Sequence, residues 1–206
     1  MSESPIAVAL TGASGIQYAL RLLEQLLAAG RQVHLLYSQA AQVVARMEAD
    51  LDLPGQPAEA ERMLSQRLGA RPGQLRGCGR QPWTAPVASG SNPPQAMVVC
   101  PCTTGTLATL ASGARDDLID RAADVMLKDR RRLILVERET PFSTIHLENM
   151  LRLSRAGAVI MPANPGFYYR PDSVADIVDF IVARILDHLD VPHELVPRWG
   201  EDAGSK

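Results

Sequence analysis

The feature that most constrains the fold is a regular alternation of short apolar runs with amphipathic stretches. Five short runs are mostly apolar, and the first of them is continuously so, which is typical of strands that are buried on both faces. The stretches between them repeat apolar residues at helical spacing, and one begins with Ser173 and Asp176 at the separation of a capping box. Strands interleaved with helices predict a parallel sheet covered on both faces, so we expect a doubly wound, Rossmann-like α/β fold with three layers. The expected strands are residues 6–11, 32–37, 96–100, 132–136 and 158–162, and the expected helical stretches are residues 17–30, 41–48, 58–70, 103–129, 143–157 and 173–189.

Size and charge limit the classes of protein to which the chain can belong. With 206 residues, of which 46% are hydrophobic, it can bury the core of one domain, which we expect to span residues 1–206. A net charge of -2 gives no reason to expect binding to nucleic acid or to an acidic membrane. The N-terminus lacks a basic segment, and no run approaches the ~18 apolar residues of a membrane-spanning helix. We therefore place the protein in the cytoplasm.

The cysteines and histidines do not predict a metal site. Cys78, Cys100 and Cys102 are an odd number, and their spacing suits neither a disulfide framework nor a zinc site. We expect them to be small buried residues, because free cysteine is usually buried. The four histidines show no metal-ligand spacing, so we expect no required metal.

The turn after the first strand, in "LTGASGIQYAL" at positions 10–20, has the composition of a ligand-binding loop. It lacks the third glycine of the dinucleotide fingerprint and the lysine of a Walker loop. Gly15 directly follows Ser14, so the G-x-S-x-G elbow of hydrolases is absent too. Ligands of doubly wound folds bind at the carboxyl ends of the strands, so we interpret this turn as an anion or ligand site of undetermined kind.

The loop after the third expected strand also has ligand-binding character. Thr103-Thr104-Gly105-Thr106 opens a helix, so its backbone N–H groups and hydroxyls can receive a phosphate with help from the helix dipole. Plain N-capping by threonine explains the same residues. Polar segments follow the other strands as well, and several of them at one sheet edge favour a ligand: Ser38, "ERETPFS" and "ANPGFYYRP".

Aromatic and charged residues add two further groups of candidates. Five of the nine aromatic side chains lie in loop-like or terminal segments, where they can face a planar ring or a carbocation, or anchor a subunit contact. The Pro- and Gly-rich segment 72–95 lacks periodicity and indicates a functional or interface loop. Lys128 is one of only two lysines against nineteen arginines, and lysine is the cation whose pKa shifts readily toward proton transfer, although an ordinary surface lysine is the alternative. The loop aromatics are Trp83, Phe167, Tyr168, Tyr169 and Trp199.

Three ordered blocks of the sequence resemble one family, the flavin prenyltransferases of the UbiX type. The blocks begin "TGASGIQYALRLL", "CPCTTGTLATLASGARDDLIDRAADVMLKD" and "GAVIMPANPGFYYRPDSVADIVDF", and the similarity runs from Ile6 to Trp199. The resemblance implies a flavodoxin-like fold and a homo-oligomer, generally a dodecamer, with the site formed between subunits. It also implies transfer of a dimethylallyl group from dimethylallyl monophosphate to N5 and then C6 of reduced FMN. The product, prenylated FMN, would serve UbiD-type decarboxylases, in many bacteria for ubiquinone synthesis.

The same resemblance implies roles for individual residues, flavin contacts first. The residues that fall where the family contacts FMN are Gly12, Ala13, Ser14, Ser38, Thr103, Thr104, Gly105, Thr106 and Arg138. Ser14 and Glu48 are expected to handle protons near flavin N5.

The donor site follows in the same way. The residues expected to contact or line the prenyl-phosphate site are Ala88, Ser89, Gly90, Tyr168, Arg184, Trp83 and Trp199, and those around the departing phosphate are Arg121, Lys128 and Glu139. Fixed cations lower the barrier to allyl-phosphate ionisation, and a protonated Glu139 can donate to the phosphate. Asp117 stands where the family usually has Asn, which either weakens phosphate binding or only caps a helix.

Two alternatives stay open from the residues. An FMN-dependent cysteine decarboxylase would share the flavin loops, but its site calls for a histidine near the first helix, where this chain has Gln17 and Tyr18. A non-catalytic FMN carrier would also explain the loops, yet it would not need Lys128, Glu139 and Arg121 together.

Overall fold

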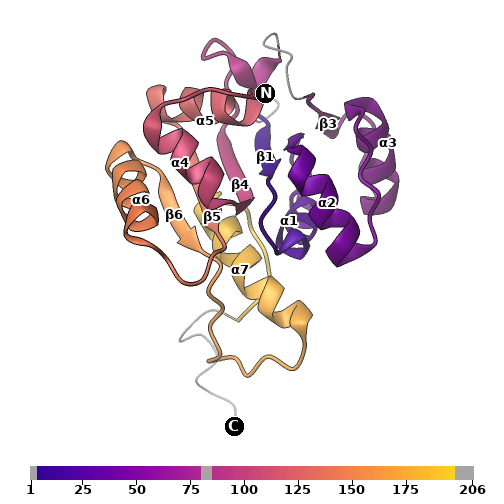
Figure 1. Cartoon of the computed structure of the whole chain (residues 1–206). Coiled ribbons are helices and arrows are strands. Elements are labelled where there is room, and N and C mark those ends of the chain that lie inside the picture. The colour runs from indigo at the N-terminus through magenta and orange to yellow at the C-terminus, as the bar shows by residue number, and fades with distance from the viewer. Residues whose placement is uncertain (1–3, 80–84, 198–206) are drawn as a thin grey trace.

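The centre of the molecule is a six-stranded parallel sheet in the order β3-β2-β1-β4-β5-β6 (Figure 1). The computed structural model describes residues 4–79 and 85–197. The five longer strands follow the flavodoxin-like order 2-1-3-4-5, and β3 is an added short strand at one edge. The expected α/β fold is therefore confirmed. The strands are β1 Ile6–Leu10, β2 Val33–Tyr37, β3 Leu75–Gly77, β4 Ala96–Cys102, β5 Arg132–Glu137 and β6 Val159–Pro162.

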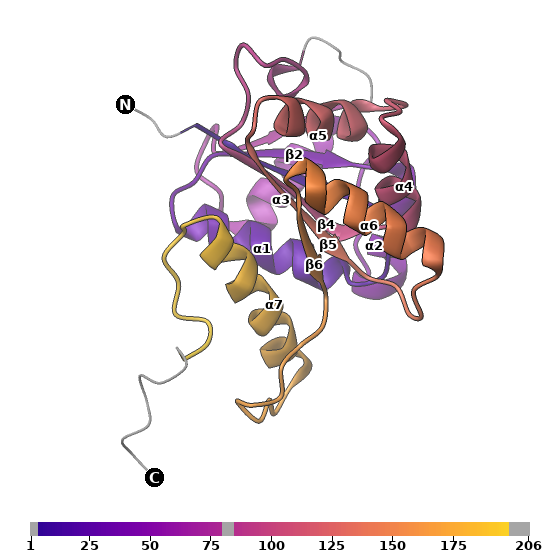
Figure 2. The ribbon, with the colours of Figure 1, turned by 90° about the vertical axis from the view of Figure 1, so that its left-hand side faces the viewer.

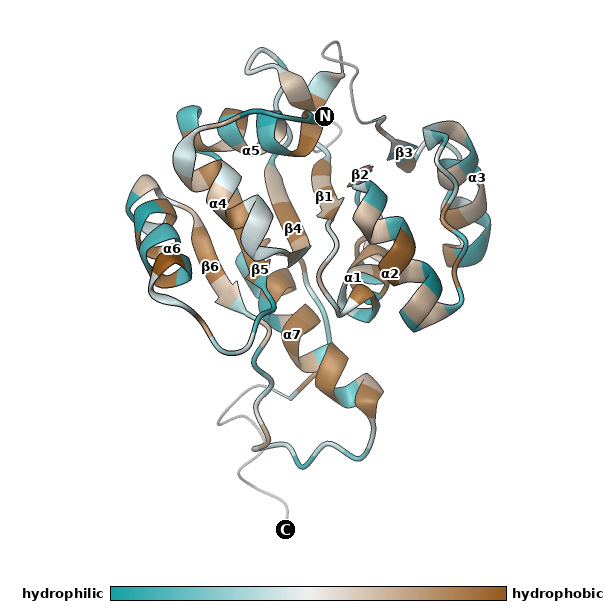
Figure 3. Ribbon diagram, in the orientation of Figure 1, coloured by the Kyte–Doolittle hydropathy of each residue, from teal (hydrophilic) through white to brown (hydrophobic). Residues whose placement is uncertain are grey.

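Helices cover both faces of the sheet, and each face has its own apolar core. Side chains of β5 alternate between them: Ile134 and Val136 pack with α1 and α7, whereas Leu133 and Leu135 pack with α4, α5 and α6. Figure 2 shows α1 and α7 on one side of the sheet and α5 on the other. Figure 3 shows mostly hydrophobic strands between helices in which hydrophilic and hydrophobic residues alternate, with α7 the most hydrophobic in appearance. The helices are α1 Ile16–Ala28, α2 Gln39–Ala49, α3 Pro57–Leu68, the 3-10 helix η1 Pro86–Ala88, α4 Thr104–Ser112, α5 Leu118–Lys128, α6 Thr144–Ala156 and α7 Val174–His188.

Two parts of the sequence fold differently from the prediction. The single helical stretch expected over residues 103–129 is two helices, because Gly113 ends α4 in the left-handed region at φ 77°. Asp117 then starts α5, accepting hydrogen bonds from the N–H groups of Ile119 and Asp120 at 2.8 and 3.1 Å. Its structural role is thus the helix cap that the sequence left as one alternative. The second difference is β3, which lies inside the segment that was expected to be only a loop.

The topology of the sheet determines where along its edge a ligand is expected to bind. The strand order reverses between β1 and β4, which is where doubly wound folds bind ligands at the carboxyl ends of their strands. The buried hydroxyl of Thr11 joins these two ends, donating to the carbonyl of Pro101 at 2.7 Å and accepting from the N–H of Thr103 at 2.9 Å. The loops after β1 and β4 are therefore held side by side.

The three cysteines do not contribute to this edge as reactive groups. Cys78, Cys100 and Cys102 are all free and buried, which confirms the sequence interpretation. Burial raises the pKa of each thiol above its usual range, so the neutral form is favoured.

Candidate active site

The turn after β1 is shaped by two glycines with different tasks. A β-carbon at Gly12 would lie 2.4 Å from the β-carbon of Ala40, so glycine lets the start of α2 pack against the turn. Gly15 precedes α1 with φ 106°, a conformation that other residues rarely adopt. These residues bring Ser14 to the switch point of the sheet.

The N-terminus of α1 is occupied by a carboxylate of the chain itself. Glu48, on α2, accepts hydrogen bonds from the N–H groups of Gly15 and Ile16 at 2.8 and 3.1 Å. Burial tends to raise the pKa of Glu48, but hydrogen bonds from the Ser14 hydroxyl and these two N–H groups, with the nearby charge of Arg138, lower it overall. The structure thus brings together Ser14, Glu48 and Arg138, three residues to which the resemblance assigned roles at the flavin. It also shows that the first N–H groups of α1 are not available as an anion cradle.

The N-termini of α2 and α4 are both capped by side chains, and the cap of α4 is the threonine that the sequence offered as one alternative. Ser38 accepts from the N–H of Ala41, and Thr103 accepts from the N–H of Thr106. The N–H groups of Thr104 and Gly105 lie in the first turn of α4, where an α-helix offers them no internal acceptor. A β-carbon at Gly105 would have Thr103 Oγ1 at 3.7 Å as its nearest contact, so this side of the turn is open to a ligand. Capping and anion binding are therefore compatible at α4.

One buried carboxyl group at this edge was missed by the sequence interpretation. Glu137 ends β5 and is 1% exposed, and neither carboxyl oxygen has a nitrogen or oxygen hydrogen-bond partner within the described residues. Its partner in the β4–β5 register is Cys102, whose thiol interacts with the carboxyl group. Burial, with a smaller effect of the Glu139 charge, raises the pKa of Glu137 to about 7. The signal in the sequence was a charged residue that directly continues the apolar run "RLILV".

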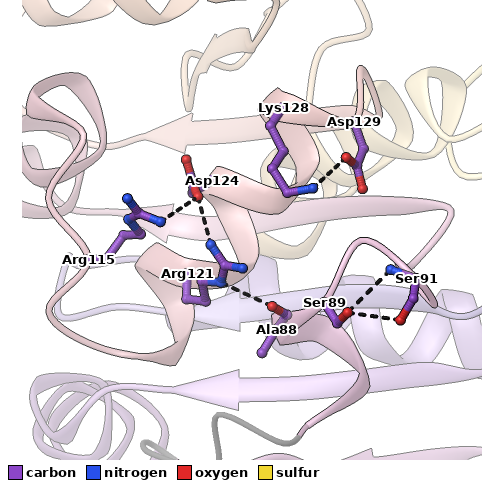
Figure 4. Close-up of polar contacts among 8 residues, drawn as sticks. All are labelled: Ala88, Ser89, Ser91, Arg115, Arg121, Asp124, Lys128 and Asp129. Carbon is purple, nitrogen blue, oxygen red and sulfur yellow. Dashed lines mark hydrogen bonds and ion pairs between the residues drawn. The ribbon is translucent and has the colours of Figure 1, made fainter.

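A second group of predicted residues lies on α5 and η1 (Figure 4). Arg121 donates through Nε to the carbonyl of Ala88 at 3.0 Å and pairs with Asp124 at 3.1 Å. Lys128 pairs with Asp129 at 2.6 Å, and a β-carbon at Gly90 would lie 2.6 Å from its Nζ. The structure therefore brings together the segment 88–90 and both cations, as the resemblance implied.

This second group is separated from the loops at the carboxyl edge. Lys128 ends α5 just before β5 begins, whereas Glu139 follows the end of the same strand. The six residues of β5 span about 16 Å, since each step along a strand is about 3.3 Å. A lysine side chain cannot cover this distance, so Lys128 and Glu139 of one chain do not meet.

A third group lies on α7 and the loop before it. Tyr168 is 78% exposed, and its neighbour Tyr169 packs against Phe180 of α7 with ring centroids 6.3 Å apart. Arg184 is one turn further along α7. Figure 1 shows this loop at the bottom of the view and α5 at the top. Trp83 and Trp199 lie outside the described residues.

Two other features of the described residues bear on the chemistry. Residues 4–79 and 85–197 contain no group of three or more His, Cys, Asp or Glu side chains arranged to hold a metal ion. None of the helices in this part of the chain is both long enough and apolar enough to cross a membrane.

Comparison with known proteins agrees with this geometry. The family model described as Flavoprotein matches residues 1–186. The flavin prenyltransferase UbiX of Pseudomonas aeruginosa is 58% identical over 196 residues, which cover 95% of this chain and 94% of that protein. The crystal structure of AnUbiX (PadA1) with FMN and dimethylallyl pyrophosphate superposes with a TM-score of 0.84 at 41% identity, covering 96% of this chain and 98% of the other.

A further solved structure is similar over almost its whole length. The dodecameric FMN-dependent UbiX-like decarboxylase of Escherichia coli O157:H7 is 38% identical with a TM-score of 0.83, and the match covers 95% of this chain and 98% of that one. Identity and coverage of this extent, together with the fold, leave one conclusion: the chain belongs to the Flavoprotein family, and within it to the flavin prenyltransferases of the UbiX type.

Proposed function

We propose that this protein transfers a dimethylallyl group from dimethylallyl monophosphate to N5 and C6 of reduced FMN, without a metal. The observation that carries the proposal is the 58% identity to a flavin prenyltransferase over 95% of the chain. The local geometry supports it, because the Ser14–Glu48 pair and the N-terminus of α4 meet at the switch point. The cysteine-decarboxylase and carrier alternatives have less support.

The residues at the carboxyl edge fit an FMN molecule. The first turn of α4 offers N–H groups beside a glycine with open space, which suits a single phosphate. Since Glu48 occupies the N-terminus of α1, we assign the phosphate to α4 and Ser38, and the ring to Gly12, Ala13 and Ser14. Reduced FMN supplies the nucleophilic ring that accepts the prenyl group. The Ser14 hydroxyl donates to the Glu48 carboxylate, and together these two groups carry protons to and from the edge of that ring.

The remaining predicted residues act on the prenyl phosphate. Arg121 and Lys128 are cations that stabilise the charge on the departing phosphate. Tyr168 and Arg184 bind the phosphate of the prenyl donor and orient it. Glu139 donates a proton to the departing phosphate. Ala88, Ser89 and Gly90 line the prenyl group, and Trp83 and Trp199 stay predicted parts of the same wall.

The separation of these groups supports a site shared between subunits. Lys128 and Glu139 lie at opposite ends of β5, so a site that uses both needs two chains. Large apolar side chains are also exposed on α2, α6, the loop before α7 and the first residue of α7, as expected for surfaces that pack against another copy: Val43, Met47, Ile145, Leu147, Leu151, Phe167 and Val174. We propose a homo-oligomer, with the dodecamer of the Escherichia coli relative as its expected form.

Mixing two impaired variants tests the shared site. Lys128→Ala and Glu139→Gln each remove one of the two residues from every site of a homo-oligomer. After dissociation and joint reassembly in equal amounts, about one site in four combines an intact Lys128 with an intact Glu139, if random assortment holds. Since each variant alone is expected to lose on the order of a hundredfold, activity should recover to about a quarter of the wild-type value. Activity that stays at the level of the separate variants would place both residues in one chain's site.

The biological setting is part of the proposal. Prenylated FMN is a cofactor for UbiD-type decarboxylases, and we propose such an enzyme as the recipient, with ubiquinone synthesis as the expected pathway. We also propose a cytoplasmic location and a single domain over residues 1–206.

The reaction is tested directly by mass spectrometry of the flavin. The purified protein is incubated without oxygen with reduced FMN and dimethylallyl monophosphate, and the molecular mass of the released flavin is measured. Addition of one isoprenyl unit is the expected result. If the flavin stays unmodified with both the monophosphate and the diphosphate donor, the transferase proposal fails and the redox or carrier alternatives return.

A further inference from the structure

The guanidinium of Arg184 is the first member of a chain of three side chains that ends in a buried histidine. Arg184 Nη1 donates to Asp187 Oδ2 at 2.7 Å, and the other carboxylate oxygen of Asp187 lies 3.1 Å from His193 Nε2. The side chains of Arg184 and Asp187 are 54% and 35% exposed, but that of His193 is only 7% exposed. The histidine therefore anchors an otherwise solvent-exposed ion pair.

The hydrogen bonds of His193 define which ring nitrogen carries the proton. The backbone N–H of Leu195 donates to Nδ1 at 3.4 Å, so Nδ1 is an acceptor. The proton of the neutral ring is then on Nε2, and Nε2–H donates to Asp187. Both oxygens of Asp187 are thus engaged, one by His193 and one by Arg184. This arrangement restricts the rotation of the carboxylate and, through it, of the guanidinium.

The same segment forms part of a cavity beside the loop before α7. A cavity of about 260 Å³ is lined by this loop, by Phe180 of α7 and by the chain from Leu195 to Pro197. His193 fixes this last stretch to α7 through Asp187, two residues before the cavity wall begins. The histidine therefore connects two elements that flank Arg184.

We infer that Asp187 and His193 are positioning residues that hold Arg184 in the orientation in which it binds the phosphate of the prenyl donor. The inference rests on the proposed prenyl transfer. Asp187 engages one of the five N–H groups of the guanidinium, so the others are left for a phosphate in a defined direction. Without His193, an exposed Arg–Asp pair three residues apart on a helix is weak and mobile.

Kinetics with a chosen set of variants test this inference. His193→Leu keeps the volume but removes the donor to Asp187, whereas His193→Gln keeps an N–H donor near the position of Nε2. We expect His193→Leu and Asp187→Asn to raise KM for dimethylallyl monophosphate about five- to tenfold, a partial loss of one charge-assisted hydrogen bond between Arg184 and the phosphate, with unchanged kcat and FMN affinity. His193→Gln should stay close to the wild type. Arg46→Gln, which breaks the exposed ion pair between Arg46 of α2 and Asp52, is the matched control and should not change KM.

A double-variant cycle separates positioning from a general structural effect. If His193 acts through Arg184, His193→Leu adds nothing to KM when Arg184 is already Ala. An equal increase in both backgrounds, or an unchanged KM in folded His193→Leu, overturns the inference. An unchanged KM in Arg184→Ala overturns it too. If the wild type itself forms no prenylated flavin, both the proposed function and this inference fail. If the wild type is active, these results test only the positioning of Arg184.

Discussion

Replacing Lys128 by Ala is expected to slow prenyl transfer by on the order of a hundredfold or more, while FMN stays bound. A preorganised cation beside a departing phosphate stabilises charge that develops only in the transition state, and removing such a group typically costs this much. Lys128 is about half exposed and pairs with Asp129, so the substitution should have little effect on folding. The single-turnover rate of prenyl-FMN formation and FMN fluorescence measure the two effects separately.

The control for this variant lies three residues further along the chain. Arg131 is an exposed cation to which no role in the site is assigned, and Arg131→Ala should retain full activity. Wild-type turnover in Lys128→Ala would remove the lysine from the mechanism. A loss of equal size in Arg131→Ala would point to the general positive charge of this surface instead.

Replacing Glu137 by Gln is expected to stabilise the protein at alkaline pH and to remove a pH dependence of its stability. The pKa of Glu137 is raised from 4.5 to about 7 in the folded protein, so between these values the folded state binds a proton that the unfolded state has released. The free energy of unfolding of the wild type should therefore fall as pH rises from about 4.5 to about 7, by about 3 kcal/mol at most, and then level off. Glutamine does not titrate, so this decrease should be missing.

Urea unfolding at pH 5 and pH 8 measures this difference. Glu137→Gln should match the wild type near pH 5 and exceed it at pH 8. Glu148→Gln changes an exposed carboxyl group on α6 and should leave the pH dependence as it is. An identical pH dependence in wild type and Glu137→Gln would show that Glu137 is ionised without cost, in conflict with its burial.

The sequence predicted the sheet well because its buried parallel strands are apolar at most positions. All five expected strands are present, and the capping box at Ser173 and Asp176 starts α7 as expected. β3 was missed because a three-residue edge strand carries too little hydrophobic pattern to differ from a loop. The break between α4 and α5 was missed because helical periodicity continues on both sides of Gly113.

The candidate site was predictable only in part, because its contacts depend on residues far apart in the chain. The resemblance named Ser14 and Glu48, but no local pattern shows that the carboxylate reaches 33 positions back to the N–H of Gly15. Asp187 and His193 have no motif at all, and their link to Arg184 becomes visible only when the C-terminal segment folds back on α7. Local spacing predicts helix caps and strands, whereas hydrogen bonds between residues far apart in the chain are visible only in the folded structure.

The carboxylate of Glu48 at the start of α1 has a consequence for the catalytic cycle. In the proposed reaction the flavin enters as one molecule and departs as another, so the pocket is emptied after every turnover. The N–H groups of the turn around Gly15 already donate to a side chain of the protein, so the conformation of the turn does not depend on a bound flavin. The turn therefore keeps its conformation while the pocket is empty, and the next FMN molecule can bind as soon as the prenylated flavin has dissociated.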